Sequence, residues 1–211
     1  MKCRKVKEIQ RLMRKIKEIF LSVQGEGCHT GVPSIFIRFS GCNLRCNFCD
    51  TEHNDGFLMS DDHIIQEVKK HRAQQIVLTG GEPSLQIDNE FIALLKQSTG
   101  LPVAIETNGT RKLPDGIDWV TVSPKTDWHS NGEGDIKVTH ADELKVVDMG
   151  QDLVQYFKLE CVDESTVMLL QPCHVSSQIQ WEKNVASTVK RVLMNPEWRL
   201  SLQTHKYIGI P

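Results

Sequence analysis

Short apolar segments alternate with amphipathic ones along most of this chain. Runs such as SIFIRF at 34–39 and QIVLT at 75–79 have the length and composition of buried strands. The segment SDDHIIQEVKKH at 60–71 carries apolar residues at helical spacing after Ser60, a residue suited to the N-cap. The pattern predicts strands over 34–39, 75–79, 102–107, 118–123, 143–147, 166–171 and 199–204, and helices over 60–71, 88–97, 151–157 and 176–194. An α/β fold with a parallel sheet flanked by helices follows.

Polar and glycine-rich clusters follow these predicted strands. They lie at 42–51, 79–83, 107–109, 123–125 and 171–174, and at His205. In parallel α/β folds, ligands bind at the carboxyl ends of the strands. We therefore expect the clusters to build one site at one rim of the sheet.

The first 20 residues differ in character from the rest. They hold eight Lys or Arg against two Glu, with Ile9, Met13, Ile16 and Phe20 at helical spacing. A solvated amphipathic helix or a frayed tail is expected there. We divide the chain into a basic N-terminal extension at 1–15 and one domain at 16–211, a size that can bury a sizeable core.

The overall charge and hydropathy narrow the class of protein. The net charge of -2 gives no general attraction to nucleic acid or acidic membranes. No apolar run approaches the roughly 20 residues of a membrane span, and the N-terminus lacks the apolar core of a secretory signal. We expect a cytoplasmic protein that binds neither membrane nor nucleic acid directly.

Three of the seven cysteines, Cys42, Cys46 and Cys49, are crowded into the stretch GCNLRCNFCDT at 41–51. A disulfide, a zinc site and an iron–sulfur cluster are the alternatives. In a reducing compartment, clustered cysteines are more often metal ligands than disulfides. A structural zinc site needs four protein ligands, whereas a [4Fe–4S] cluster held by three thiolates leaves one iron open to a ligand. The spacing favours the cluster.

This loop resembles the signature of the radical S-adenosylmethionine (SAM) enzymes, with Phe48 at the aromatic position of C-x3-C-φ-C. The stretch TGGEP at 79–83 is similar to their second motif. There, glycines permit close backbone approach and Glu82 can neutralise the amino group of SAM. The resemblance implies that SAM binds the open iron and that its reductive cleavage yields a radical that abstracts hydrogen from the substrate.

A closer resemblance, to the 7-carboxy-7-deazaguanine synthase family of queuosine biosynthesis, covers nearly the whole chain from about residue 16. It is carried by EIFLSVQGEGCHTGVPSIFIRFSGCNLRCNFCDT, LTGGEP, ETNGT, VSPK, ELKVV, QP and QTHKYIGIP. It implies a modified, incomplete TIM-type (βα)6-like barrel of the radical SAM class. It also implies a Mg²⁺-dependent lyase that contracts the ring of 6-carboxy-5,6,7,8-tetrahydropterin to 7-carboxy-7-deazaguanine with loss of ammonia. A homodimer and a flavodoxin or ferredoxin reductant are implied as well.

The resemblance also implies roles for individual residues, with no side chain as acid or base. The implied substrate contacts come from Val23, Gln24, Gly25, Glu26, Arg38, Thr79, His205 and Pro211. The implied SAM contacts come from Gly81, Glu82, Ser123, Pro124, Lys125, Gln171, Pro172, Cys173 and His174. The implied metal ligands are Cys42, Cys46 and Cys49 for the [4Fe–4S] cluster and Thr51 for Mg²⁺. Cys173 and His174 are not typical of the family.

Alternatives remain open from the residues themselves. Arg38, in an apolar strand, suits a substrate carboxylate or an internal salt bridge. Thr51 suits a magnesium ligand or a turn hydroxyl. The apolar ending YIGIP predicts a docked rather than a frayed terminus. For the whole chain, the rival functions are a radical SAM activating enzyme acting on a partner protein, and a non-catalytic iron–sulfur or zinc-binding module.

Overall fold

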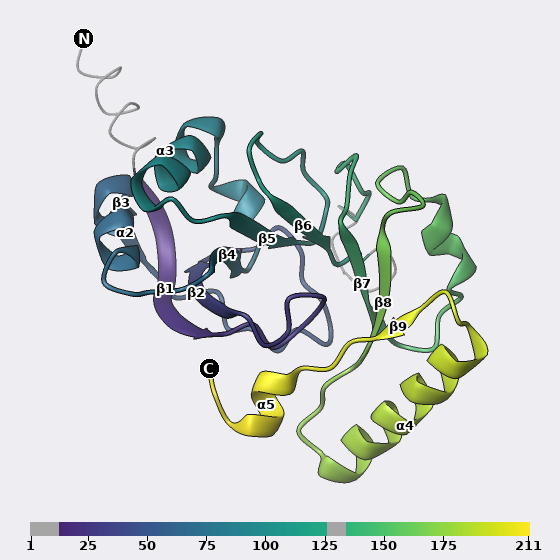
Figure 1. Cartoon of the computed structure of the whole chain (residues 1–211). Coiled ribbons are helices and arrows are strands. Elements are labelled where there is room, and N and C mark those ends of the chain that lie inside the picture. The colour runs from purple at the N-terminus through teal and green to yellow at the C-terminus, as the bar shows by residue number, and fades with distance from the viewer. Residues whose placement is uncertain (1–12, 126–133) are drawn as a thin grey trace.

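The computed structural model describes residues 13–125 and 134–211 (Figure 1). Its strands form one nine-stranded sheet in the order β3-β1-β2-β4-β5-β6-β7-β8-β9. The strands are β1 (Met13–Val23), β2 (Pro33–Phe39), β3 (Phe57–Ser60), β4 (Gln75–Gly80), β5 (Val103–Thr107), β6 (Trp119–Val122), β7 (Glu143–Asp148), β8 (Val167–Pro172) and β9 (Arg199–Leu200). From β2 to β9 every neighbouring pair is parallel, which confirms the predicted parallel sheet and the incomplete TIM-type barrel.

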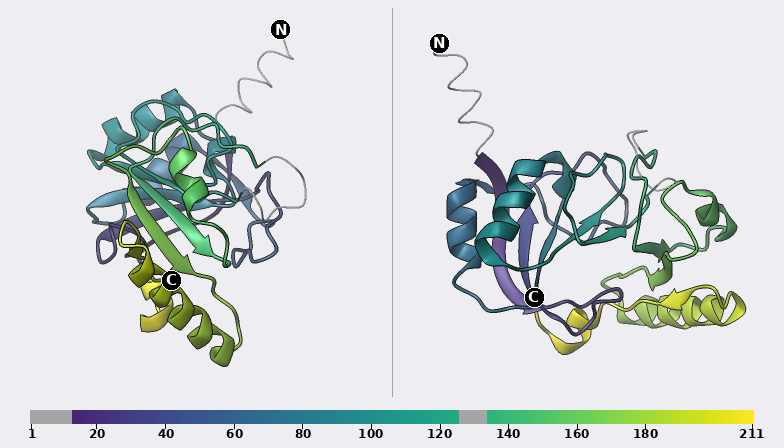
Figure 2. Two further views of the ribbon diagram at one scale, coloured as in Figure 1. Left: turned by 90° about the vertical axis from the view of Figure 1, so that its right-hand side faces the viewer. Right: turned by 45° about the horizontal axis from the view of Figure 1, so that its top comes forward.

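The helices lie at the two ends of the sheet. They are α2 (Asp61–Val68), α3 (Asn89–Thr99), α4 (Gln178–Met194) and α5 (Thr204–Ile208), with 3₁₀ turns η1 (Pro83–Leu85) and η2 (Val154–Lys158). Helices α2 and α3 pack together near β1, whereas α4 packs on β8 and β9 (Figures 1 and 2). The predicted N-cap is confirmed, because the Ser60 hydroxyl accepts a hydrogen bond from the His63 amide.

The expectation of a helix or frayed tail is wrong for residues 13–20, which belong to β1. This strand pairs antiparallel with both β2 and β3, so sheet hydrogen bonds override the helical spacing of its apolar residues. Its buried Arg14 forms ion pairs with Asp61 (2.7 Å) and Asp88 (3.2 Å) at the start of α2 and α3. The rest of the expected extension lies outside the described residues, and the division at residue 15 stays a prediction.

Two other expected elements differ from those in the structure. The predicted helix at 151–157 is the 3₁₀ turn η2, and the predicted strand at 199–204 ends at Leu200. The chain then turns into the short helix α5, which brings residues 203–206 beside the β1–β2 loop (Figure 1). Among the helices that the structure describes, none has both the length and the apolar character needed to cross a lipid bilayer.

Candidate active site

A cavity of about 580 Å³ opens at the carboxyl ends of the parallel strands. Strands β2, β4, β5, β7 and β8 each contribute a residue to its lining from their carboxyl ends, as the sequence predicted for one rim. These residues are Arg38, Thr79, Thr107, Val147 and Gln171. All predicted site residues line this cavity except Glu82 and Pro124. The fold therefore collects predicted site residues that lie up to 188 positions apart, from Val23 to Pro211, around one space.

The cysteine loop forms one wall of the cavity. Cys42, Cys46 and Cys49 all line it, and burial raises the pKa of the Cys42 and Cys46 thiols. The cysteines of the described residues are free thiols, so the disulfide alternative is excluded for them. Within the described residues, no three His, Cys, Asp or Glu side chains gather as ligands of a single metal ion. A cluster fits better, because each of its thiolates binds a different iron.

The glycine turn after β4 packs directly on this loop. The Glu82 amide donates to the Gly41 carbonyl (2.9 Å), and the Gly81 amide donates to the Phe39 carbonyl (3.1 Å). A Cβ atom at Gly81 would lie 2.0 Å from the Gly41 carbonyl oxygen and 3.1 Å from the Cys42 Cβ. Only glycine allows the two motifs to approach this closely, so the cysteine loop and the turn form one rigid unit.

Glu82 lies behind the cavity wall and not in it. The side chain is fully buried, and its carboxylate accepts hydrogen bonds from the Thr107 hydroxyl (2.7 Å) and the Asn108 amide (2.7 Å). A third bond comes from the Ser84 amide (3.0 Å). These bonds hold the ends of β4 and β5 together, and the predicted contact of the buried carboxylate with SAM stays a prediction. Pro124 is also buried outside the cavity lining.

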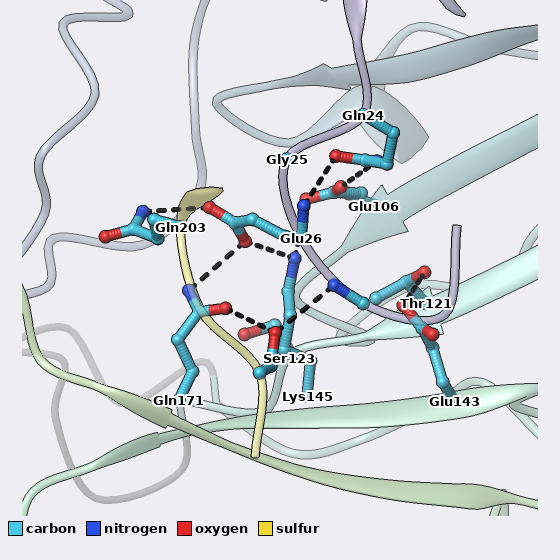
Figure 3. A network of polar contacts seen from close by, with 12 residues as sticks. Gln24, Gly25, Glu26, Glu106, Thr121, Ser123, Glu143, Lys145, Gln171 and Gln203 are labelled. Atoms are coloured by element: carbon cyan, nitrogen blue, oxygen red, sulfur yellow. Dashed lines mark hydrogen bonds and ion pairs between the residues drawn. The ribbon is translucent and has the colours of Figure 1, made fainter. Parts of the chain in front are cut away.

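A buried ionic network lies at the centre of the cavity floor (Figure 3). The Lys145 ammonium on β7 binds Glu26 of the β1–β2 loop (2.5 Å) and Glu106 of β5 (3.0 Å). Burial disfavours the charged forms of Glu26 and Lys145, but Lys145 outweighs burial and lowers the pKa of Glu26 to about 2. The Glu106 and Glu26 carboxylates, in turn, outweigh burial and raise the pKa of Lys145. The Glu26 carboxylate and the Lys145 ammonium are therefore both charged at neutral pH.

Amides and hydroxyls complete this network. Gln203 and Gln171 donate to the two oxygens of Glu26 (2.8 and 3.2 Å), and Gln24 donates to Glu106 (2.9 Å). Cys28, which directly follows the QGEG loop, is also held by a carboxylate, because its amide donates to Glu143 on β7 (2.8 Å). Four contacts, from Glu106 on β5, Lys145 on β7, Gln171 on β8 and Gln203 of the C-terminal segment, thus hold Gln24 and Glu26 of the QGEG loop across the open side of the barrel (Figure 3).

The C-terminal segment covers the same loop. The Thr204 amide and hydroxyl both donate to the Gly25 carbonyl (2.8 and 2.9 Å). The ring of His205 lies so close that a Cβ atom at Gly25 would be 2.2 Å from its Nδ1 atom. Burial lowers the pKa of His205, so the ring is neutral near pH 7. The Ser22 hydroxyl donates to the Pro211 carbonyl (2.8 Å), which confirms the docked terminus.

Thr51 and Asp50 lie at the cavity edge between the cysteines and the C-terminal segment. The Thr51 hydroxyl is 3.5 Å from a carboxylate oxygen of Asp50, and Lys206 pairs with the other oxygen. Burial opposes the Asp50 charge, but Lys206 outweighs it and lowers the pKa of Asp50. Hydroxyl and carboxylate oxygens are suitable ligands for Mg²⁺, although the structure leaves the turn-hydroxyl alternative for Thr51 open.

Arg38 has an internal partner. Its Nε atom donates to Glu18 (2.7 Å) on the neighbouring strand β1, and its guanidinium lies 5.5 Å from the centre of the Phe20 ring. This is the salt bridge that the sequence left as the alternative to a substrate carboxylate. Arg38 still lines the cavity, and the exposed pair with Glu18 is weak enough to be exchanged for a ligand.

The predicted SAM segments also line the cavity, and Gln171 lies against the QGEG loop. Lys125 donates through its ammonium to the Ser123 carbonyl (3.0 Å), and burial lowers its pKa. Cys173 is buried, with its carbonyl held by Asn184 (2.8 Å), and the His174 ring packs on Trp181 at 5.1 Å. Both residues therefore pack against α4, and their departure from the family stays a prediction.

Sequence reasoning missed several cavity residues, above all Lys145, Gln203 and Lys206. One signal was available for Lys145, because a lysine inside the apolar strand ELKVV needs an anionic partner just as Arg38 does. Gln203 and Lys206 carried no such signal, since a polar residue after a strand is ordinary. Their partners Glu26 and Asp50 are more than 150 positions away.

Known proteins resemble this chain over most of its length. Residues 36–128 match the family described as the Radical SAM superfamily. A 7-carboxy-7-deazaguanine synthase of Bacteroides thetaiotaomicron is 53% identical over 199 residues, covering 94% of this chain and 100% of that protein. One from Haemophilus influenzae is 35% identical over 198 residues, covering 92% and 93%. The crystal structure of QueE from Escherichia coli aligns with a TM-score of 0.72 at 29% identity, covering 92% of this chain and 95% of that one.

Proposed function

This chain belongs to the 7-carboxy-7-deazaguanine synthase family of radical SAM enzymes, and we propose that it contracts the ring of 6-carboxy-5,6,7,8-tetrahydropterin to 7-carboxy-7-deazaguanine with loss of ammonia. The observation that carries this proposal is the convergence of four segments on one cavity. The cysteine loop, the glycine turn, the QGEG loop and the docked C-terminus all line it.

The cofactor sites follow from the cavity wall. Cys42, Cys46 and Cys49 would hold a [4Fe–4S] cluster, and the glycine turn at Gly81 beside it gives the backbone approach that SAM needs. Ser123, Lys125 and residues 171–174 line the rest of the SAM side. When bound, the cluster and SAM supply the one-electron chemistry that removes hydrogen from the substrate. The chain itself orients the reactants and excludes water.

The substrate side lies between the QGEG loop and the C-terminal segment. Glu26 is ionised and fixed by Lys145, so it offers a preorganised acceptor for the N–H donors of a pterin ring. Gly25 lines the cavity, and the absence of a side chain there leaves room for the ring of His205. Arg38, after release from Glu18, would bind the substrate carboxylate through its planar guanidinium.

Magnesium would bind at Thr51, with substrate oxygens completing its coordination. Mg²⁺ uses few protein ligands and keeps water or substrate oxygens in the others. Asp50 lies 3.5 Å from the Thr51 hydroxyl and is held ionised by Lys206, which supports a role in orienting the ion's ligands.

A homodimer and a flavodoxin or ferredoxin electron donor complete the proposal. Exposed apolar side chains support self-association, among them Ile179, Leu193 and Met194 on α4, each at least 69% exposed. Light scattering on the purified protein would give the mass of one or two 24.0 kDa chains directly.

Anaerobic reconstitution with iron and sulfide tests the proposed reaction. The protein is incubated with SAM, Mg²⁺, dithionite and the carboxytetrahydropterin, and the products are identified by mass spectrometry. The proposal predicts 7-carboxy-7-deazaguanine with SAM recovered unchanged. Stoichiometric SAM cleavage with no pterin conversion would instead favour an activating enzyme, and absence of SAM binding would favour a non-catalytic module.

A further inference from the structure

A second depression of about 580 Å³ lies beside the cysteine loop, outside the catalytic cavity. Three cationic side chains line it, Arg111, Lys112 and Lys137, against the single carboxylate of Asp135. All four residues are exposed. We call this surface the basic pocket.

Among the described residues, the cations of the basic pocket have no anionic partner. Arg111, Lys112 and Lys137 form no ion pair there, unlike the cavity residues Arg38, Lys145 and Lys206. Three unpaired cations around one hollow create a positive potential that attracts an anionic surface. The net charge of the whole chain is -2, so this potential is local.

The pocket is joined to the cysteine loop by hydrogen bonds. Asn43, next to Cys42, donates to the Thr110 hydroxyl (2.8 Å) and accepts from the Asn108 amide group (3.0 Å). Arg111 and Lys112 follow Thr110 directly. Cys42 therefore lines the catalytic cavity while its neighbour Asn43 lines the basic pocket, so the loop separates the two.

A further polar group of the pocket lacks a partner. The hydroxyl oxygen of Ser84 is buried and makes no hydrogen bond with any described residue. Ser84 lines the basic pocket and lies two residues from Glu82 in the turn that packs on the cysteine loop. An unsatisfied buried hydroxyl costs free energy unless a water or ligand group supplies the missing bond.

We propose that the basic pocket is the docking surface for an acidic one-electron carrier protein. This inference rests on the proposed function, because the carrier gives up one electron and the cluster held by Cys42, Cys46 and Cys49 gains it. SAM and substrate would occupy the catalytic cavity, so the electron must enter from the other side of the loop. Electron-transfer encounters are small and transient, and complementary charge speeds their formation. Three cations beside the cluster loop meet those requirements.

Binding provides a test that does not depend on turnover. The affinity of a flavodoxin for the as-purified protein is measured by fluorescence anisotropy at low ionic strength. For the double variant R111E/K112E, we expect the dissociation constant to rise by about tenfold or more. The control variant K69E/R72E makes the same change in charge on an exposed lysine and an exposed arginine at the end of α2, and we expect its affinity to stay within about twofold of wild type. Equal loss in both variants, or no loss in either, would overturn the proposal.

Turnover with two electron donors separates docking from chemistry. With flavodoxin as donor, R111E/K112E should lose about tenfold in rate, and added salt should slow the wild type toward the variant. With dithionite, which needs no docking surface, both proteins should turn over alike. With flavodoxin as donor, the rate of the neutral variant R111Q/K112Q should lie between the rates of the wild type and R111E/K112E. A variant that is equally slow with both donors contradicts the assignment, whereas a wild type inactive with dithionite contradicts the proposed function and leaves the affinity result to decide docking.

Discussion

The buried pair of Lys145 and Glu26 is the residue-scale feature on which the substrate side depends. One ammonium serves Glu26 and Glu106, and the three side chains come from different parts of the chain. Removing the ammonium would leave two carboxylates buried without a cation, and breaking such a pair typically costs about 3–5 kcal/mol.

Lys145→Met is therefore expected to lower the free energy of unfolding by about that amount and to raise KM for the pterin more than KM for SAM. Chemical denaturation and steady-state kinetics measure the two effects. The double variant Lys145→Met/Glu26→Gln should recover part of the lost stability, because one unpaired charge is gone. If the single and double variants are equally unstable, Lys145 does not act through Glu26.

The lowered pKa of Glu26 predicts how stability depends on pH. The group titrates at about 2 in the folded protein against 4.5 in the unfolded chain. Its contribution is fully present above pH 4.5 and is lost as the pH falls toward 2. The difference in unfolding free energy between wild type and Glu26→Gln should shrink across that interval, as followed by denaturant titrations. A difference that stays constant from pH 6 to 2.5 would contradict the assignment.

Thr51 offers a residue-scale test of the magnesium site. Thr51→Ala should raise the Mg²⁺ concentration needed for half-maximal activity by about tenfold or more, while Thr51→Ser, which keeps the hydroxyl, should not. Magnesium titrations of the reconstituted enzyme measure this. An unchanged magnesium requirement in Thr51→Ala would mean that the hydroxyl only stabilises the turn.

Residues that act through a local motif could be predicted from sequence, and residues that act through distant partners could not. The cysteines, Gly81 and the QGEG loop are short continuous motifs whose chemistry is readable from spacing. The burial of Glu82 behind the cavity wall could not be predicted, because a carboxylate in a loop carries no sign of which side it faces. Gln203 was missed because its partner, Glu26, is brought beside it only by the complete fold.

At the scale of elements, the C-terminal segment and the β1–β2 loop act as one unit. Helix α5 has no buried residue of its own. Thr204 at its start is bonded to Gly25, and Pro211 beyond its end accepts a hydrogen bond from Ser22. The contact of His205 with Gly25 leaves no room for a side chain at position 25.

Gly25→Ala should therefore displace α5 at a cost of about 1–3 kcal/mol, as overpacking does. We expect faster proteolysis of the C-terminus and a higher KM for the pterin, with SAM affinity unchanged. The double variant Gly25→Ala/His205→Gly removes the clashing side chain and should restore protease resistance. A tail that is equally protected in Gly25→Ala and wild type would show that the docking is not needed.

Most elements of the sheet were predictable because buried parallel strands form continuous apolar runs. Strand β1 was not, since its apolar residues also fit a helical period and only pairing with β2 and β3 decides between the two. The shortening of β9 and the helix α5 depend similarly on contacts with the β1–β2 loop. The local pattern therefore predicts strands whose apolar runs are continuous, and it fails where pairing with distant strands decides between helix and strand.

For the whole molecule, the incomplete barrel explains why the QGEG loop and the C-terminus are needed. The sheet does not close on itself, and β3 and β9 remain its two edges. The buried network fills the opening with charges that pair with strands β5, β7 and β8 (Figure 3). One side of the cysteine loop then faces the catalytic cavity, and the other faces the basic pocket.

The central claim is that three thiolates hold a [4Fe–4S] cluster whose fourth iron is open to SAM. Electron paramagnetic resonance of the reconstituted, reduced protein, recorded with and without SAM, tests this most directly. We predict about four irons per chain and a signal that changes when SAM is added. A zinc-bound protein, or a cluster signal that SAM leaves unchanged, would contradict the account.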